Sequence, residues 1–248
     1  MRIIIVGSGS KGNAVLLESG GTVIQIDMGL TLKRIKEALS DNNLKPSAIK
    51  ALFLTHDHAD HISGVPLYHG KVPLYAGEGT IDCLTHALKP FETIEIGSFK
   101  ITPFNVSHDA VNPMGFLFDD GKSKLGYVTD TGLLEDDVLN LLKDCDYYYF
   151  ESNHDLKMLY DSSRPKFLKD RIHSKHGHLS NVDSAIYLSS LIGPRTKEIY
   201  LAHLSEECNC EEVALKSQYL TYERYGVDLS NVKIICAKQY ETVVGGDK

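Results

Sequence analysis

Hydrophobic residues gather in short runs along this chain, separated by polar and glycine-containing turns. Near the start, residues 14–18 and 22–27 have the character of two β-strands, and the Ser19-Gly20-Gly21 sequence between them is typical of a hairpin. Later apolar runs of strand length predict further strands at residues 51–54, 101–106, 125–129, 147–150, 199–201 and 232–237.

Helical periodicity, with apolar residues three or four positions apart, alternates with these strands. It predicts helices within residues 31–40, 80–89, 133–144 and 180–192, the last of which opens with the capping pattern Ser180-x-x-Asp183. Alternating strands and helices indicate an α/β protein, and the hairpin shows that its sheets are not purely parallel. We expect a single domain over residues 1–248, because this length can support one full hydrophobic core.

Three early glycines, Gly7, Gly9 and Gly12, spell the G-x-G-x-x-G pattern of dinucleotide-binding sites. Such a site requires the last glycine to open a helix whose N-terminus holds the pyrophosphate. Here a strand pattern follows instead. We therefore interpret residues 8–13 as a tight loop between strands.

The composition is that of an ordinary globular protein, with 42% hydrophobic and 24% charged residues. No apolar stretch approaches the length of a membrane helix. The first ten residues contain too short an apolar run for a secretory signal. We therefore expect a cytoplasmic protein without a membrane partner. The 5 cysteines are scattered and form no C-x-x-C pair, which argues against a disulfide framework and a zinc finger.

The charge is unevenly distributed. The chain carries a net charge of −7, yet residues 157–178 contain six Lys or Arg against two Asp. A basic segment of this kind can be a solvated loop, but it is also what a phosphate-facing surface needs.

Side chains suited to metal binding or proton transfer stand directly after the predicted strands. His56, His108, Asp130, Glu151 and His203 each follow or end an apolar run. Ligands bind outside the carboxyl ends of strands in α/β proteins, so one shared site is the simplest explanation.

The densest cluster is His56-x-His58-x-Asp60-His61, four ligand-type residues within six positions. Imidazole and carboxylate are common ligands of divalent metals. Residues two apart in an extended loop point the same way, so His56 and His58 can share one metal. Asp60 and His61, where the chain turns into a helix, would face a second.

The H-x-H-x-D-H pattern, followed by separated His, Asp and His, resembles the metallo-β-lactamase superfamily. The resemblance implies a four-layer αβ/βα sandwich with two mixed sheets over essentially the whole chain, and a site with two divalent ions of zinc, manganese or iron. An Asp at the bridging position is similar to the dinuclear hydrolases and unlike the secreted zinc β-lactamases. By this resemblance one metal is held by His56, His58 and His108, the other by Asp60, His61 and His203, and Asp130 bridges both.

Flanking stretches resemble the YycJ/WalJ group of bacterial proteins, some of which are 5′-to-3′ double-stranded DNA exonucleases. The stretches are "GSGSKGN", "THDHADH", "VTDTG", "ESNHD", "HGHLSN" and "LAHLSEECN". We therefore predict a metal-dependent exonuclease whose partner is nucleic acid, in particular duplex DNA ends, with a metal-bridging hydroxide as nucleophile.

The proton for the leaving oxygen requires further residues. "ESN" and "HLS" resemble motifs of the tRNA 3′-processing nucleases, which implies that His178 donates the proton and Glu151 orients it. The predicted catalytic residues are thus Asp60, Glu151 and His178, and the predicted substrate-binding residues are His154, His176, Ser180 and Asn181. Asp57 is expected to orient a ligand imidazole, and Asp27 either to touch the site or to anchor its loop.

Other activities fit the same ligand set. An RNA-processing enzyme or a small-molecule phosphodiesterase would share the core, although no dedicated RNA-binding insertion is evident. A thioester hydrolase of the acylglutathione type would leave the Glu151 and His178 pair and the basic segment without a purpose. A non-catalytic scaffold is disfavoured by the complete ligand set, and the oligomeric state is not predicted.

Overall fold

The computed structural model describes residues 1–68 and 70–247. Contacts within the chain define two compact units. The first comprises Met1–Asn105, Ala110–Ser123 and Lys238–Lys248, and the second comprises Val106–Asp109 and Lys124–Ala237. The strands belong to two seven-stranded sheets, both of them mixed, so the expectation of an α/β sandwich with two mixed sheets is confirmed. The expectation of one domain stays a prediction.

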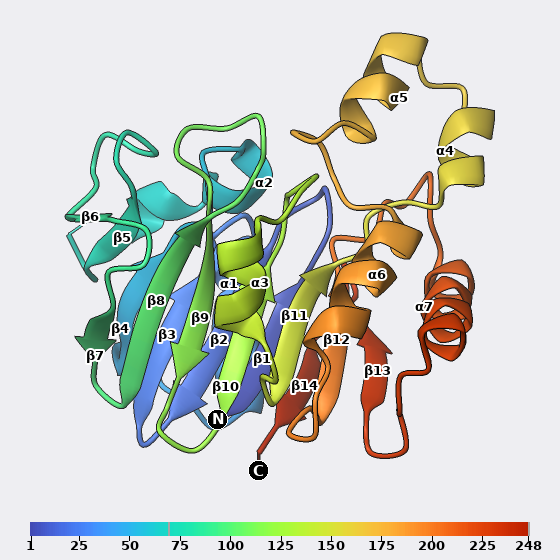
Figure 1. Cartoon of the computed structure of the whole chain (residues 1–248). Helices are drawn as coiled ribbons and strands as arrows, with labels where there is room; N and C mark the ends of the chain where they lie inside the picture. Colours follow the sequence, from blue (N-terminus) through green and yellow to red (C-terminus); the bar gives the residue numbers. More distant parts are fainter. Residues whose placement is uncertain (69, 248) are drawn as a thin grey trace. The chain divides into compact units, whose positions relative to one another are not determined.

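The first unit is built around one complete sheet and three antiparallel strands (Figure 1). The complete sheet runs in the order β14-β1-β2-β3-β4-β5-β6, antiparallel from β14 to β3 and parallel from β3 to β6. Its strands are β1 (Arg2–Gly7), β2 (Ala14–Ser19), β3 (Thr22–Ile26), β4 (Ile49–Phe53), β5 (Leu74–Gly77), β6 (His86–Leu88) and β14 (Val243–Gly246). The antiparallel strands are β7 (Ile94–Ile96), β8 (Phe99–Asn105) and β9 (Met114–Asp119).

Short helices complete the first unit. They are α1 (Leu32–Asp41), α2 (Ala59–Ile62) and the 3-10 helices η1 (Pro46–Ala48) and η2 (Val65–Leu67). Helix α1 begins where Thr31 accepts a hydrogen bond from the Arg34 N–H, and its apolar face buries Ile35 and Leu39. These side chains pack in a core with Ile4 and Leu16 of the sheet, which explains why this periodic segment is helical.

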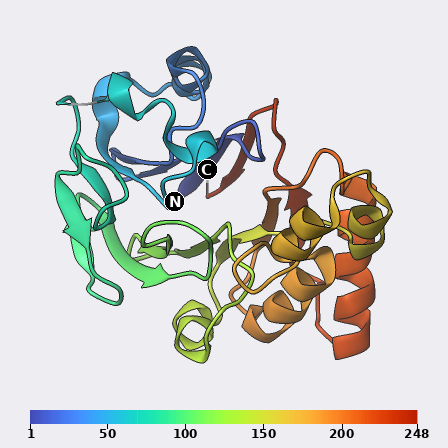
Figure 2. The same ribbon diagram turned by 90° about the horizontal axis from the view of Figure 1, so that it is seen from above.

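The second unit has four parallel strands and five helices among its described residues. The strands, in spatial order, are β10 (Lys124–Val128), β11 (Tyr147–Glu151), β12 (Glu198–Ala202) and β13 (Lys233–Cys236). The helices are α3 (Asp136–Leu142), α4 (Leu156–Asp161), α5 (Lys166–Ile172), α6 (Asn181–Leu191) and α7 (Glu211–Tyr225), with α6 packed on α7 (Figure 2). The three consecutive tyrosines Tyr147, Tyr148 and Tyr149 of β11 are buried, as expected of packing residues.

The glycine-rich loop has the role inferred for it. It joins β1 to β2, so no helix follows it and the dinucleotide interpretation is excluded. Gly12 adopts φ +135°, and a Cβ there would lie 2.3 Å from the carbonyl oxygen of Gly29. Only glycine fits this close approach of two backbones.

The structure departs from the predicted helices at residues 80–89 and at α7. The periodic segment 80–89 contains no helix, because His86–Leu88 forms strand β6 and pairs with β5. Conversely, α7 was not predicted, although it is the longest helix described, at 15 residues. It buries Ala214, Gln218, Thr221 and Tyr222, and this mixture of small and polar side chains hides the apolar periodicity.

No helix among the described residues is both long enough and apolar enough to cross a membrane.

Candidate metal and catalytic site

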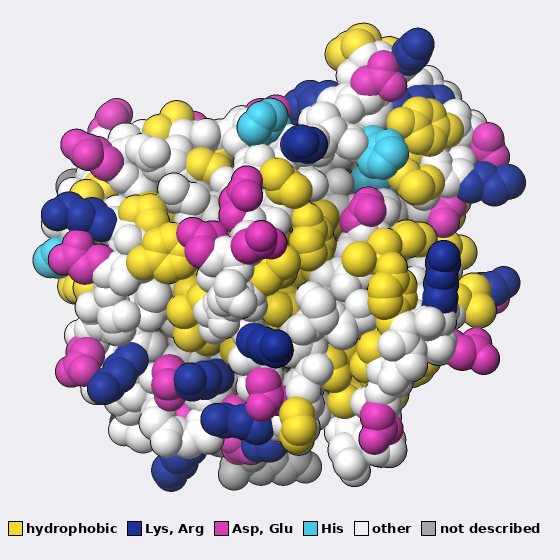
Figure 3. All heavy atoms as spheres, viewed as in Figure 1, with side chains coloured by type: hydrophobic (Ala, Val, Ile, Leu, Met, Phe, Trp, Pro, Cys, Tyr) yellow, Lys and Arg dark blue, Asp and Glu magenta, His cyan; other side chains and the backbone are white. Residues whose placement is uncertain are grey.

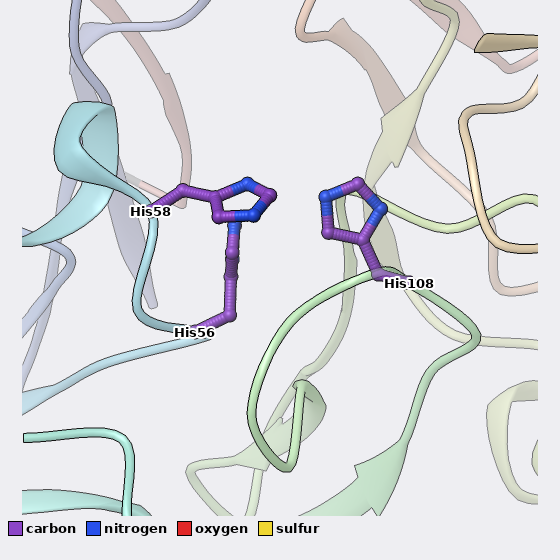
Figure 4. A group of neighbouring side chains, drawn as sticks. All are labelled: His56, His58 and His108. Atoms are coloured by element: carbon purple, nitrogen blue, oxygen red, sulfur yellow. The ribbon is translucent and has the colours of Figure 1, made fainter. Parts of the chain in front are cut away.

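The H-x-H-x-D-H loop follows β4 and runs into α2 in the first unit. The imidazole centroids of His56 and His58 are 4.5 Å apart, and those of His56 and His61 are 4.1 Å apart. Figure 4 shows the rings of His56 and His58 next to each other on this loop, and labels His108 on the loop that follows β8. Three histidines of the loop therefore gather their ring nitrogens in one place, as the spacing predicted for the first two.

A buried carboxylate from a neighbouring strand end orients His61. Oδ2 of Asp27 lies 2.8 Å from Nδ1 of His61, and neither side chain is exposed. Thr55 holds the same carboxylate through its backbone N–H at 2.9 Å and through its hydroxyl. When Nδ1 of His61 donates to Asp27, Nε2 keeps its lone pair, which is the form that binds metals.

The glycine-rich loop reaches the other side of His61. Nδ2 of Asn13 lies 3.0 Å from Nε2 of His61 and 3.3 Å from Oδ2 of Asp60. Gly29 makes this arrangement possible, because a Cβ there would lie 1.5 Å from the carbonyl oxygen of Asp60. Asn13 had not been predicted, although it closes the "GSGSKGN" stretch.

The roles expected of Asp57 and Asp27 are resolved by these contacts. Asp57 accepts a hydrogen bond from the Val111 N–H at 3.1 Å, and no histidine of the described residues forms a hydrogen bond with it. The carboxylate with that role is Asp27, which both touches His61 and anchors the loop at Thr55.

The second unit contains a compact group of donors: Asp130, Glu151, His178 and His203, whose ligand atoms lie within 4.8 Å of one another. Asp130 and His203 follow the parallel strands β10 and β12, Glu151 ends β11 between them, and His178 precedes α6. The carboxyl ends of parallel strands meet at one edge of a sheet, which explains how residues so distant in sequence converge. Asp130, Glu151 and His203 therefore lie close together, as expected of residues at strand ends, and their function as a shared site stays a prediction.

Glu151 is the centre of this group. Its Oε1 lies 2.7 Å from Nδ1 of His178 and 3.3 Å from Nδ1 of His203. Its Oε2 accepts the backbone N–H groups of Thr131 at 2.9 Å and Leu179 at 3.3 Å. Burial would raise the pKa of Glu151, but the charge of His178 and the hydrogen bonds from His178 and His203 outweigh it and lower this pKa to about 2. Glu151 is therefore an ionised acceptor at neutral pH.

Asp130 lies beside the same imidazoles. Its Oδ1 is 3.4 Å from Nδ1 of His203 and 3.6 Å from Nδ1 of His178, and its Oδ2 accepts the Thr129 hydroxyl at 2.7 Å. His108 belongs to the same unit and has Nδ1 3.0 Å from the carbonyl oxygen of Gly177. That contact turns Nε2 of His108 toward Asp130 Oδ1, at 4.0 Å. Asn153, a residue not predicted, lies with Nδ2 3.2 Å from Nδ1 of His203.

Three residues at these strand ends have left-handed backbone conformations. The φ angles are 57° for Asp27, 51° for Asp130 and 55° for His203. This region is unfavourable for residues with a Cβ and persists only where the surroundings enforce it. Its occurrence at three donor-bearing positions indicates that the backbone is shaped to aim their side chains.

The predicted substrate-binding residues occupy varied environments. Ser180 caps α6 and donates its hydroxyl to Asp183, as the capping pattern predicted, and buried Asn181 bonds to Asn209. His176 is exposed, with Nδ1 3.0 Å from the Ser107 hydroxyl. His154 is fully buried, and burial, followed by the charge of His178, lowers its pKa to about 4. Their role toward a substrate stays a prediction.

The basic segment folds into α4 and α5 and is partly neutralised. Lys157 pairs with Asp161 at 3.2 Å, Arg164 with Glu207 at 2.9 Å and Arg171 with Asp109 at 2.5 Å. Figure 3 shows Lys and Arg side chains with histidine and hydrophobic groups over the α4 and α5 part of the viewed face. The segment is less strongly basic than its composition suggested.

No disulfide forms among the described residues, and none of the five cysteines belongs to a group of potential metal ligands there.

Residues 24–203 match the β-lactamase superfamily domain. The chain is 37% identical over 225 residues to the exodeoxyribonuclease WalJ of Streptococcus pneumoniae serotype 2 (strain D39 / NCTC 7466), covering 85% of this chain and 84% of that protein. It is 33% identical over 238 residues to the exodeoxyribonuclease YycJ of Bacillus anthracis, covering 90% of each. The metallo-β-lactamase fold protein YhfI of Bacillus subtilis has a similar structure, with a TM-score of 0.74, 18% identity and coverage of 98% and 99%.

Proposed function

We propose that this chain, which belongs to the β-lactamase superfamily, is an exonuclease that digests duplex DNA from 5′ to 3′. Its fold and its relatives indicate a metal-dependent hydrolase. The names of the WalJ and YycJ relatives support a DNA substrate. The observation that carries the proposal within this chain is the buried Glu151 in contact with His178, next to Asp130 and His203. A hydrolase that only needed metal ligands would have no use for this further pair.

Divalent metal binding fits the donors of both units. Carboxylate and imidazole groups suit zinc, manganese and iron, and the Asp27 contact sets the tautomer of His61 for metal binding. We propose the ligand set that the family pattern implies: one ion at His56, His58 and His108, a second at Asp60, His61 and His203, and Asp130 as the bridge. When bound, such ions would activate water and neutralise phosphate charge.

The proposed task of His178 is to protonate the leaving oxygen. Its Nδ1 contacts the ionised Glu151, so its Nε2–H is available to a substrate. The His178 side chain keeps 18% of its surface exposed, so a substrate can reach the ring. His178 can therefore donate a proton to an alkoxide that leaves phosphorus, while Glu151 fixes the direction of the ring.

The segment of α4 and α5 is the proposed phosphate-facing surface. Lys166 and Lys175 are exposed, and no carboxylate of the described residues pairs with either of them. Two free ammonium groups supply a modest attraction to a polyanion, which predicts salt-sensitive DNA binding. Duplex ends as the partner and the cytoplasm as the location are predictions that accompany this proposal.

The test compares substrates with one purified, metal-loaded protein. Linear duplex DNA with a 5′-phosphate, single-stranded DNA, RNA and bis(p-nitrophenyl) phosphate are incubated separately, with Asp130→Ala as the inactive control. We expect nucleotides to be released from the duplex fastest and from its 5′ ends. Hydrolysis of the small diester with all nucleic acids intact would reject the nuclease, and faster digestion of RNA would move the assignment to RNA processing.

A further inference from the structure

A pocket of about 360 Å³ opens beside His178 in the second unit. It lies among the loop that follows β10, the segment after α5 and the first turns of α6. None of the residues predicted to bind substrate lines it, so it was not foreseen from the sequence. Its position next to the proposed proton donor makes it a suitable location for a nucleoside that carries the leaving oxygen.

One wall of the pocket is apolar. Leu133, Ile186 and the ring of Tyr187 line it, and Ile186 keeps 39% of its surface exposed. The Tyr187 hydroxyl accepts the Leu134 N–H at 3.3 Å, which fixes the position of the ring. An apolar wall with a positioned aromatic ring suits a nucleobase, whose face is apolar and whose edge is polar.

The remaining wall provides charged groups of both signs. Asp183 lines the pocket and receives the Ser180 hydroxyl at 2.6 Å, so its carboxylate is held in place and can accept from a base amine. Lys175 is exposed on the same pocket, and its ammonium group has no carboxylate partner among residues 1–68 and 70–247. An amine in this position suits a phosphate group.

We propose that this pocket binds the nucleotide that carries the leaving oxygen, an inference that rests on the proposed nuclease function. In the reaction, water oxygen bonds to phosphorus and the bond from phosphorus to the sugar oxygen breaks, with its electron pair going to that oxygen. His178 supplies the proton to the sugar oxygen and is reprotonated from solvent, which receives the proton lost by water. The nucleotide that departs is then already seated beside His178.

A 5′-to-3′ direction of digestion determines which nucleotide occupies the pocket. The terminal nucleotide leaves through its 3′ oxygen and still carries its own 5′-phosphate. The pocket accordingly holds a deoxynucleoside 5′-monophosphate, with the base against Ile186 and Tyr187 and the 5′-phosphate at Lys175.

The first experiment fills the pocket. Ile186→Trp places a large side chain in it, and Leu220→Trp, at an exposed apolar residue of α7 that does not line it, is the matched control. The metal-loaded proteins are assayed with d(pTpT) and with bis(p-nitrophenyl) phosphate, which has no nucleoside. We expect Ile186→Trp to raise KM for d(pTpT) about tenfold with kcat little changed, and to leave the aryl diester unaffected.

The second experiment removes the cation. Lys175→Ala is compared with Lys216→Ala, another exposed lysine, on d(pTpT) and on d(TpT), which lacks the 5′-phosphate. Loss of one charged contact should raise KM for the phosphorylated dinucleotide about tenfold and spare the other substrate. Calorimetric titration with thymidine 5′-monophosphate should show the same loss for Lys175→Ala and for Ile186→Trp.

Several outcomes would overturn the inference. Equal losses on the aryl diester and on d(pTpT) would mean that the substitutions disturb His178, and unchanged KM values would mean that the pocket stays empty. Hydrolysis of the aryl diester without any dinucleotide or DNA cleavage would reject the proposed function itself. In that case the titration with thymidine 5′-monophosphate tests the pocket independently of activity. An absence of binding to the wild-type protein would then overturn the proposal.

Discussion

Nδ1 of His178 lies 2.7 Å from Oε1 of Glu151, a carboxylate with no exposed surface. The two residues are 27 positions apart in the chain. The second oxygen of Glu151 is held by backbone N–H groups, so the carboxylate cannot rotate away from the imidazole. This contact fixes the direction of the His178 ring, as the proposed role of His178 as proton donor requires.

Glu151→Gln should lower kcat by roughly 10²–10⁴ with little change in KM, because a neutral amide holds the His178 ring less firmly in the direction that the proposed proton transfer needs. Its NH2 group would also face either His178 or the backbone N–H of Thr131. Steady-state kinetics on duplex DNA measure the effect, and Glu207→Gln, on an exposed carboxylate paired with Arg164, is the control. A kcat within twofold of the wild type would remove Glu151 from the mechanism.

Asp27→Asn should weaken divalent metal binding about 10–100-fold, because it removes the carboxylate that fixes the tautomer of His61. Competition with a chromogenic chelator measures the affinity. Asp57→Asn is a matched control in the same unit and should leave the affinity unchanged, since the Asp57 side chain accepts the Val111 N–H and bonds to no histidine of the described residues. A larger loss for Asp57→Asn would restore the role predicted for it from the sequence.

His154 should make the folded protein less stable as the solution becomes acidic. Its pKa is lowered from 6.5 to about 4 by burial and by His178, so the unfolded chain binds the proton first. The stability present above about pH 6.5 is therefore lost progressively down to about pH 4, by about 3 kcal/mol in total. Urea unfolding of the metal-free protein across this range should show a smaller pH dependence for His154→Gln, and no change for His86→Gln, at an exposed residue. An unaltered slope in His154→Gln would contradict the assignment.

Gly29→Ala should destabilise the protein by about 3 kcal/mol, since its Cβ would overlap the carbonyl oxygen of Asp60 and push the H-x-H-x-D-H loop aside. Gly21→Ala is the control for backbone conformation: Gly21 has φ +78° with no neighbour within 4 Å, so only strain of about 1 kcal/mol is expected. Thermal unfolding and metal affinity are measured together. A change confined to stability, with normal metal affinity, would show that the loop tolerates the displacement.

Lys166→Ala should reduce the salt dependence of DNA binding, because each phosphate contact contributes about 0.9 to the slope of log Kobs against log salt. Lys157→Ala is the comparison, since the Lys157 ammonium is already paired with Asp161 and should contribute less. Both slopes are measured by fluorescence anisotropy of labelled duplex DNA, with protein whose metal ions have been removed by a chelator. Identical slopes for the wild type and Lys166→Ala would place the DNA away from α5.

Local patterns predicted elements well where apolar periodicity and burial coincide, as in α1 and the β2–β3 hairpin. They were wrong for His86–Leu88, which forms a strand because β5 offers a parallel partner, a pairing that no local pattern contains. Helix α7 was missed because it packs through residues such as Gln218, whose burial depends on hydrogen bonds to α6. In each case the decisive interaction is distant in sequence.

The sequence by itself determined the family, the α/β class and the donor-type side chains at the ends of strands, because these depend on residue types at short spacings. Only the tertiary structure decided which carboxylate meets which imidazole: Asp27 rather than Asp57 at His61, and Glu151 at both His178 and His203. It also created the pocket of about 360 Å³ at His178 from segments that share no motif. The physical reason is that hydrogen bonds and cavities depend on positions within a few ångströms, which strand register and loop conformation set after the chain has folded.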